Sequence, residues 1–358
     1  MYRFILFLTF SFISFGAFTQ LTVKDLKDSK TYLLHPDDLK WNKKLVPFNN
    51  IIVIDNRFDT TKLGYKKESR KYEKLNLESG LAGTMQQMIH STLQANMDAS
   101  SNSSLYIFVK HLWIQPTTEL EFAKQKLYDA GMDNDTSYVS CKATLESFIL
   151  KDDLFYPLHR IDSSFLIEGK MDEKSNYIVS LPFQLLINKL NEIDLSRNRK
   201  PVDYKTVIRH YKDRFSSPRM QTDTMVRGVY KTYKDFLSNN ISNPSFIIKY
   251  QKLGRHRFIL DEEEQELLHN IWGYYDGEKL FIKLGTSFYE LIRENNSFEF
   301  VGSKNLIRFN NTQGVYVPAP HPGFLVGGAV LDEVSKIKNI KAKNIRPLQL
   351  NMETGEPY

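Results

Sequence analysis

The residues of this chain that are best suited to chemistry lie at positions 55–61, in the run DNRFDTT. They follow the β-branched run 51–54, which predicts a buried strand. Open sheets place their sites at the carboxyl ends of strands, so Asp55, Arg57 and Asp59 are candidate binding residues. The two carboxylates also suit an acid/base pair or part of a metal site, if further ligands converge on them in the fold. The alternative interpretation is an ordinary polar loop, for which Asp, Asn and Thr are the usual residues.

A second candidate binding site consists of aromatic side chains next to lysines. Tyr230 and Tyr233 flank Lys231 and, three positions apart, would share one face of a helix expected over 230–237. Trp272 opens a later aromatic run. Such side chains stack on sugars or bases or lie at a membrane interface. The alternative is that they pack in the hydrophobic core.

No motif in the sequence specifies a reaction. The single cysteine, Cys141, lies in an alternating strand pattern that favours burial over nucleophilic catalysis. The eight histidines include no pair at zinc-ligand spacing, no Gly-x-Ser-x-Gly elbow occurs, and no Gly-rich phosphate loop follows the first strand. We therefore predict no catalytic residue, no metal ligand and no bound cofactor.

Residues 1–19 have the layout of a secretory signal peptide. Arg3 supplies the positive charge, 4–18 is an almost unbroken apolar run, and Thr19 ends a small-x-small pattern before Gln20. The run is shorter than the roughly 20 residues that span a bilayer, so we expect cleavage and no transmembrane span afterwards. An uncleaved N-terminal anchor is the alternative. Since one cysteine cannot form an intramolecular disulfide, we predict a periplasmic or secreted bacterial envelope protein that folds on core packing alone.

Composition and charge narrow the function classes further. With 41% apolar residues, 24 Phe and 19 Tyr, the chain can build sizeable cores. The formal net charge is +6, and residues 189–257 hold sixteen Lys and Arg against six Asp and Glu. A second basic stretch covers 336–346. Export argues against a nucleic-acid partner, so these stretches predict either solvated faces or peripheral contact with an anionic membrane.

Hydrophobic periodicity predicts the elements that must position these residues. In the first half we expect helices over 80–97 and 181–193 and strands over 51–54, 105–114, 138–150 and 156–167. In the second half, Asp276 and Gly277 form a tight-turn dipeptide inside a hairpin over 272–282. Further strands are expected over 245–250, 287–292, 297–301 and 345–352.

This order of elements predicts an α+β fold with two domains, a mixed sheet with packed helices followed by a small antiparallel sheet with a helix. We expect the following divisions: a signal peptide at 1–19, an N-terminal segment at 20–44, an α/β envelope-type domain at 45–195, a basic linker at 196–224, a small α+β domain at 225–317, and a Pro/Gly-rich segment with a C-terminal tail at 318–358.

The strand-helix-strand-strand order of residues 45–195, opened by Ile51-Ile52-Val53-Ile54-Asp55 after a leader, resembles a module of bacterial envelope proteins. That module occurs in the amino-terminal domain of the Tol-system β-propeller protein and in outer-membrane lipoproteins of the curli-secretion type. The second half is similar to uncharacterised exported proteins of Gram-negative bacteria. The resemblance implies contacts with other proteins or self-assembly rather than catalysis, and it assigns no functional residue.

The prediction is therefore an exported cell-envelope protein that works by non-enzymatic binding or assembly, with another envelope protein or itself as the partner. Two alternatives stay open. One is an envelope hydrolase with dispersed catalytic residues, for which Asp55 and Asp59 are the first candidates. The other is a protein that binds the membrane surface through its basic stretches.

Overall fold

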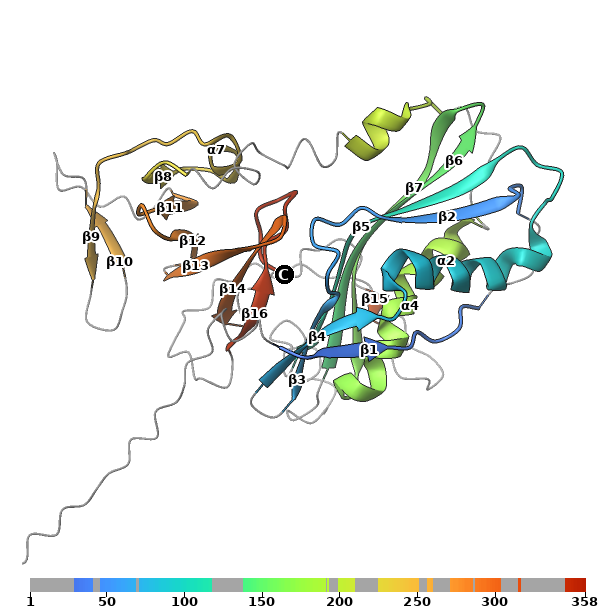
Figure 1. Ribbon diagram of the computed structural model, residues 1–358, viewed down its shortest axis with the longest axis horizontal. Coiled ribbons are helices and arrows are strands. Elements are labelled where there is room, and N and C mark those ends of the chain that lie inside the picture. Colours follow the sequence, from blue (N-terminus) through green and yellow to red (C-terminus); the bar gives the residue numbers. More distant parts are fainter. Residues whose placement is uncertain are drawn as a thin grey trace, which may run out of the picture.

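The described residues have an α+β fold with two large β-sheets, the first packed against two helices and the second accompanied by one, and with a separate two-stranded pair (Figure 1). This computed structural model describes residues 29–40, 46–68, 71–117, 138–190, 192, 199–209, 225–250, 256–259, 271–285, 287–303, 315–316 and 345–358. The predicted fold class, a mixed sheet with packed helices and a smaller antiparallel sheet with a helix, is confirmed.

The first sheet has eight strands in the order β1-β4-β3-β5-β6-β7-β15, with β2 paired to β5 outside this path. Strands β5, β6 and β7 form a long antiparallel meander, whereas β1, β2 and β15 are added in parallel to β4, β5 and β7. The strands are β1 (Thr31–Leu34), β2 (Asn50–Asp55), β3 (Gly64–Glu68), β4 (Lys71–Leu77), β5 (Ser104–Thr117), β6 (Tyr138–Lys151), β7 (Leu154–Glu168) and β15 (Val315–Tyr316).

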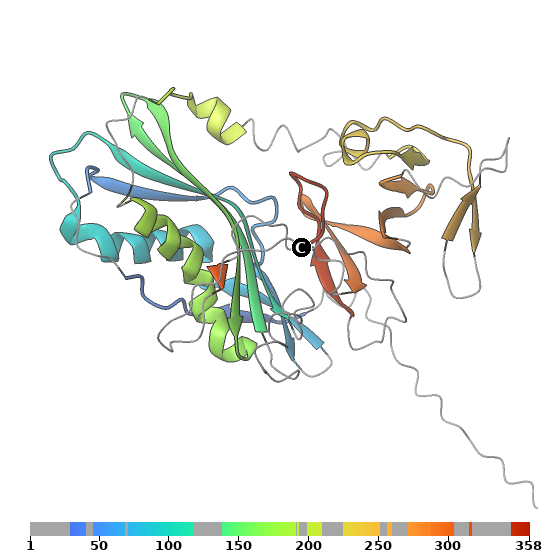
Figure 2. The same ribbon diagram turned by 180° about the vertical axis from the view of Figure 1, so that it is seen from behind.

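Helices α2 (Gly80–Leu93) and α4 (Met171–Leu190) cover one face of the first sheet, and the second sheet lies on the other side (Figures 1 and 2). Helix α2 buries an apolar residue every four positions, the spacing of one helical face. The alternating apolar side chains of β5, β6 and β7 meet both helices in one large core. The predicted buried face of β6, which includes Cys141, is confirmed.

Helix α4 differs from the helix expected over 181–193, because it begins at Met171. Met171, Ser175 and Ile178 lie at helical spacing and are buried, and the first turn carries two acidic residues that suit a helix N-terminus. Pro182 therefore lies inside the helix rather than in its first turn. A proline there removes one backbone donor from the helix.

The second sheet has six antiparallel strands in the order β16-β14-β13-β12-β11-β8. They are β8 (Gly228–Tyr230), β11 (Gly273–Tyr275), β12 (Leu280–Leu284), β13 (Ser287–Glu294), β14 (Ser297–Ser303) and β16 (Ile345–Gln349). Helix α7 (Tyr233–Ser238) accompanies this sheet, and β9 (Ile247–Tyr250) and β10 (His256–Ile259) form a separate pair. The turn at Asp276 and Gly277 is present as predicted, with Gly277 at φ 110°.

The helix expected over 230–237 is shorter than predicted, because Tyr230 belongs to strand β8. Thr232 and Asp235 form a reciprocal capping box, which starts helix α7 at Tyr233. Tyr230 and Tyr233 therefore do not share a helix face. In the region expected as a linker, Val202 pairs with Phe155 and a π-helical turn covers Lys205–Arg209.

Candidate functional site

The candidate residues after strand β2 form an internal ion pair. Arg57 donates from Nε and Nη2 to the two carboxylate oxygens of Asp55 at 2.8 and 2.7 Å, a bidentate arrangement. Its Nη1 donates to the carbonyl oxygen of Lys62 at 2.6 Å. Because Arg57 is buried, this guanidinium ties the loop together.

Asp59, Lys62 and Glu299 form a second, fully buried cluster, which we call the ion triad. The Lys62 ammonium lies 2.6 Å from Asp59 Oδ2 and 2.7 Å from Glu299 Oε1, and none of the three side chains is more than 1% exposed. The Tyr65 hydroxyl donates to Glu299 Oε2 at 2.9 Å. One ammonium thus serves two carboxylates, and a tyrosine hydroxyl adds a hydrogen bond.

Burial and charge act against each other within the ion triad. Burial disfavours the ionised Asp59, but the Lys62 ammonium and the bonds from Lys62 and Thr61 outweigh it and lower the pKa of Asp59. For Glu299 burial is the stronger influence, so its pKa is raised despite Lys62 and Tyr65. Burial also opposes the charge on Lys62, yet the two carboxylates raise its pKa. The triad therefore holds two carboxyl groups whose pKa values are shifted in opposite directions.

The ion triad joins the two sheets. Asp59 and Lys62 come from the connection between β2 and β3, whereas Glu299 lies on β14. Two further contacts cross the same interface: Arg346 donates to the carbonyl oxygen of Pro116 at 2.7 Å, and Arg160 pairs with Glu353 at 3.1 Å. The interface thus combines buried charged and polar groups with an aromatic cluster, in which Tyr65, Tyr72 and Trp113 of the first sheet meet Tyr358.

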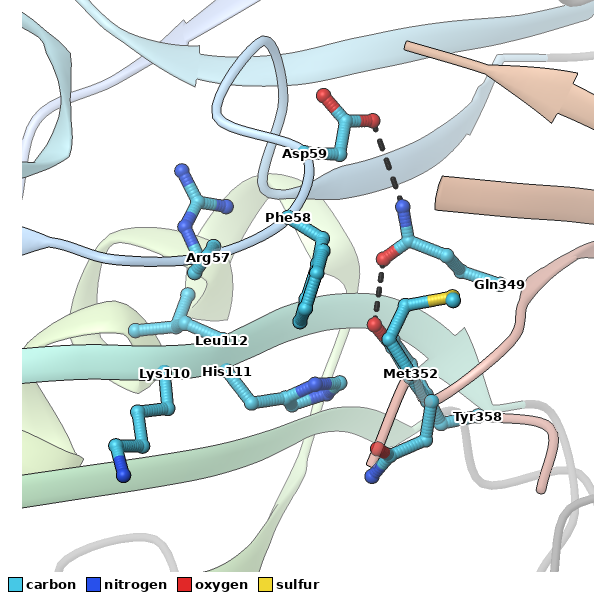
Figure 3. A pocket seen from close by; sticks show the side chains of 10 residues that line it. Arg57, Phe58, Asp59, Lys110, His111, Leu112, Gln349, Met352 and Tyr358 are labelled. Carbon is cyan, nitrogen blue, oxygen red and sulfur yellow. Dashed lines mark hydrogen bonds between the residues drawn. The ribbon is translucent and has the colours of Figure 1, made fainter. Parts of the chain in front are cut away.

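A small pocket lies beside the ion triad, where three parts of the chain meet (Figure 3). Arg57 and Asp59 line it from the β2–β3 connection, His111 from β5, and Gln349 and Tyr358 from the C-terminal segment. Gln349 donates to Asp59 Oδ2 at 3.4 Å and accepts from the Tyr358 hydroxyl at 2.6 Å. The pocket has room for about one water molecule.

A β-bulge directs His111 into this pocket. In the pairing of β5 with β6, Val109 lies opposite Leu145 and His111 opposite Thr144, so Lys110 is the extra residue. Such a bulge reverses which side chains face each side of a sheet. The His111 ring lies edge-on to the ring of Tyr358, with the two ring centroids 3.8 Å apart. The Nε2 atom of His111 has no hydrogen-bond partner among the described residues. Burial, with Lys142 and Arg57 nearby, lowers the pKa of His111 well below its usual value.

The candidate aromatic residues pack in the hydrophobic core of the second sheet. Tyr230 is fully buried and donates to Asn239 Oδ1 at 3.1 Å. The Tyr233 hydroxyl donates to the carbonyl oxygen of Met352 at 2.9 Å. Trp272 is partly buried and stacks on Phe236, with the two ring centroids 4.7 Å apart. The structure therefore places all three around one core rather than on an open platform.

Other sequence features have plain structural roles where they are described. Cys141 is buried in the core of the first sheet, and burial raises the pKa of its thiol. Arg346, from the second basic stretch, is buried at the interface, and burial lowers its pKa to about 10. The rest of that stretch, from 336 to 344, lies outside the described residues, as does much of 189–257.

The described residues hold neither a cluster of metal ligands nor a membrane-spanning helix. They contain no group of three or more His, Cys, Asp and Glu side chains placed to hold a metal ion. In the same part of the chain, no helix combines the length and apolar character needed to cross a bilayer.

Sequence reasoning found Arg57 and Asp59 but missed Lys62, His111, Glu299, Gln349 and Tyr358. Lys62 follows Asp59 by three residues, a spacing that the sequence displays. Glu299 stands between Phe298 and Phe300, and an acidic residue in an apolar strand signals a buried partner. The contacts between the sheets have no local signal, because they join residues up to 290 positions apart.

No family model matches the chain, and no curated protein matches it either.

Proposed function

We propose that this protein is an exported cell-envelope protein that acts by binding or assembly rather than by catalysis. The observation that carries the proposal is that the ionisable groups after strand β2 are paired with other side chains of the protein. Asp55 is bound by Arg57, and Asp59 shares Lys62 with Glu299. The first pair holds the β2–β3 connection and the ion triad joins the two sheets, and the pocket beside them has room for about one water molecule.

The envelope location is supported by the leader-like residues 1–19 and by the resemblance of 45–195 to envelope modules. Both lines of support come from the sequence. The buried Lys62–Glu299 ion pair and the partly exposed Arg160–Glu353 pair join the sheets and favour a fixed arrangement of two surfaces, which suits contacts with a large partner better than closure around a small one.

Fractionation and cross-linking in intact cells test this proposal. The chain carries a C-terminal epitope tag in a Gram-negative host, and we expect a product that lacks residues 1–19 in the envelope fraction. We also expect one reproducible cross-linked partner or a defined oligomer. The matched control is Leu8→Arg, which places a charge in the apolar run and should leave the chain unprocessed in the cytosol.

Two outcomes would contradict the proposal. The first is an unprocessed wild-type chain that is dissolved in the cytosol. The second is a hydrolytic turnover by purified protein that Asp59→Asn abolishes while the fold is retained, which would favour the hydrolase alternative.

A further inference from the structure

The two sheets are docked on each other through side chains. In the described structure they share no strand pairing. Contacts that cross between them include the Lys62–Glu299 ion pair and the ring contact of Trp113 with Tyr358. Such an interface can open without breaking the backbone bonds of either sheet. Docking is therefore an equilibrium of its own, and a change in one buried group shifts it.

His111 lies at this interface, on the face of β5 that meets the C-terminal segment (Figure 3). It is 7% exposed, its Nε2 has no hydrogen-bond partner among the described residues, and its ring lies against that of Tyr358. An imidazolium donates from both ring nitrogens. In the docked state, a proton on Nε2 would meet a pocket with room for about one water molecule.

Charges of both signs surround His111, but the carboxylates among them are already paired. The charges on the first sheet and on β14 are Arg57, Asp59, Lys110, Lys142, Glu146 and Glu299. The C-terminal segment adds the titratable groups Tyr358 and Glu353. Each of these carboxylates has a cationic partner, whereas Arg57 and Lys142 act on His111 and oppose its protonation. The docked interface therefore holds a neutral imidazole and disfavours a charged one.

We propose that His111 is a proton sensor that controls docking, and that its protonation undocks the second sheet together with the C-terminal segment 349–358. The inference concerns the fold itself and does not rest on the proposed function. An imidazolium at this position reaches water and hydrogen-bond acceptors when the two sheets separate, so the proton favours the undocked form.

The second sheet is the side that leaves, because the surroundings of His111 on the first sheet are fixed. Strand β5 is paired with β6 along its length and with β2 on its other edge. The C-terminal segment instead belongs to the second sheet. The Tyr233 hydroxyl donates to the carbonyl oxygen of Met352, and Trp272 Nε1 donates to that of Gly355. The segment and the sheet therefore move together.

Proton linkage sets the size of the effect. In the undocked form the pKa of His111 returns towards its usual value of about 6.5, whereas in the docked form it is well below that. Each pH unit below about 6.5 therefore raises the undocked fraction about tenfold, until the docked pKa is reached. Glu299 acts in the opposite direction, because burial raises its pKa. Asp59, whose pKa is lowered, contributes only below about pH 4.

Thiol labelling at two neighbouring positions of β6 tests the sensor. Cys141 faces the core beneath the helices, whereas Ser140 is 2% exposed on the opposite face, the one that carries Trp113. Ser140→Cys in a Cys141→Ala background therefore reports opening of the interface, and Cys141 of the unchanged chain reports opening of the first core. Each rate with a pyridyl disulfide reagent is divided by the rate of the urea-unfolded chain at the same pH.

We expect the relative rate at Ser140→Cys to be at least about tenfold higher than at Cys141, because the interface opens without the core. Between pH 6 and pH 5 it should rise about five- to tenfold, and adding His111→Gln should abolish that rise. His159→Gln is the matched control. This histidine lies near Lys189 of α4, and its replacement should leave the pH dependence unchanged.

Equal relative rates at the two positions would overturn the proposal, since the interface would then open only when the whole chain unfolds. A rise that persists with His111→Gln would overturn the role of His111 as the sensor. Gln115→Cys, 6% exposed on the same face of β5, gives a second reporter that should follow the same pH dependence. A pH-independent rate at both reporters would also contradict the proposal.

Discussion

At the scale of single residues, the site is defined by charges buried with their partners. A lone buried charge is costly, but a hydrogen-bonded pair recovers much of that cost and loses it again when one member is removed. Lys62 is the critical member of the ion triad, because it is the cation shared by two carboxylates. His111 is the contrasting case, a buried imidazole whose Nε2 has no hydrogen-bond partner in the described structure.

His111 should make the protein sensitive to mild acid. Its pKa in the folded state is lowered, so below about pH 6.5 the unfolded chain binds a proton that the folded chain does not. Stability is therefore complete above that pH and falls by about 1.4 kcal/mol for each pH unit below it, until the folded pKa is reached. Arg57 and Lys142 oppose protonation, and Asp59 lines the same pocket.

Denaturant unfolding between pH 7 and pH 5 checks this prediction. His111→Gln should remove the part of the slope that His111 causes, whereas His35→Gln, at an exposed position, should leave the slope as in the wild type. An unchanged slope in His111→Gln would show that carboxyl groups alone cause the acid sensitivity.

At the scale of elements, local periodicity predicted most of the long strands, and the dipeptide Asp276-Gly277 predicted the turn between β11 and β12. Strands β5, β6 and β7 alternate clearly, and Cys141 lies on the buried face as expected. Strands β3 and β4 were missed because they are short and rich in charge, with Lys66, Lys67, Glu68 and Lys71 at their junction. Their burial comes from the second sheet and from β1, neither of which is local in sequence.

The site itself was only partly predictable for the same physical reason. Asp59 was a candidate because acidic residues follow a β-branched run. Its burial in an ion cluster depends on Lys62 and on Glu299, which is 240 positions away. Tyr230 shows a local pattern that tertiary contacts override. It lies at helical spacing from Tyr233, but it pairs with Gly273 in the second sheet and is part of a strand. Short segments carry weak propensities, so tertiary contacts decide them.

Gly64 should be essential to the junction of β3 with β5. It has φ 144°, and a Cβ there would lie 1.8 Å from the carbonyl oxygen of Ile114. Gly64→Ala should therefore destabilise the protein by on the order of 3 kcal/mol or prevent folding. Gly83→Ala is the matched control, since its Cβ would meet only ordinary contacts inside helix α2 and should stabilise by about 0.5–1 kcal/mol. Chemical denaturation measures both, and equal effects of the two substitutions would contradict the assigned backbone conformation.

At the scale of the whole molecule, the interface makes the two sheets depend on each other. Each has its own apolar core, yet Lys62 from the first contacts Glu299 from the second, and Tyr358 packs against Trp113 of β5. Cores of this size fold cooperatively within themselves. Whether they unfold together depends on the interface, which contains both the buried ion triad and the contact of Tyr358 with Trp113.

Removal of the shared cation should uncouple the two sheets. Lys62→Met leaves Asp59 and Glu299 buried without their ammonium, which should cost about 3–5 kcal/mol. Hydrogen exchange with mass spectrometry reports β6 and β12 separately at rising denaturant. In the wild type we expect both strands to lose protection together, and in Lys62→Met we expect β12 to lose it first. Lys67→Met, an exposed lysine on β3, should behave like the wild type. Independent loss of protection in the wild type would mean that the ion triad does not couple the sheets.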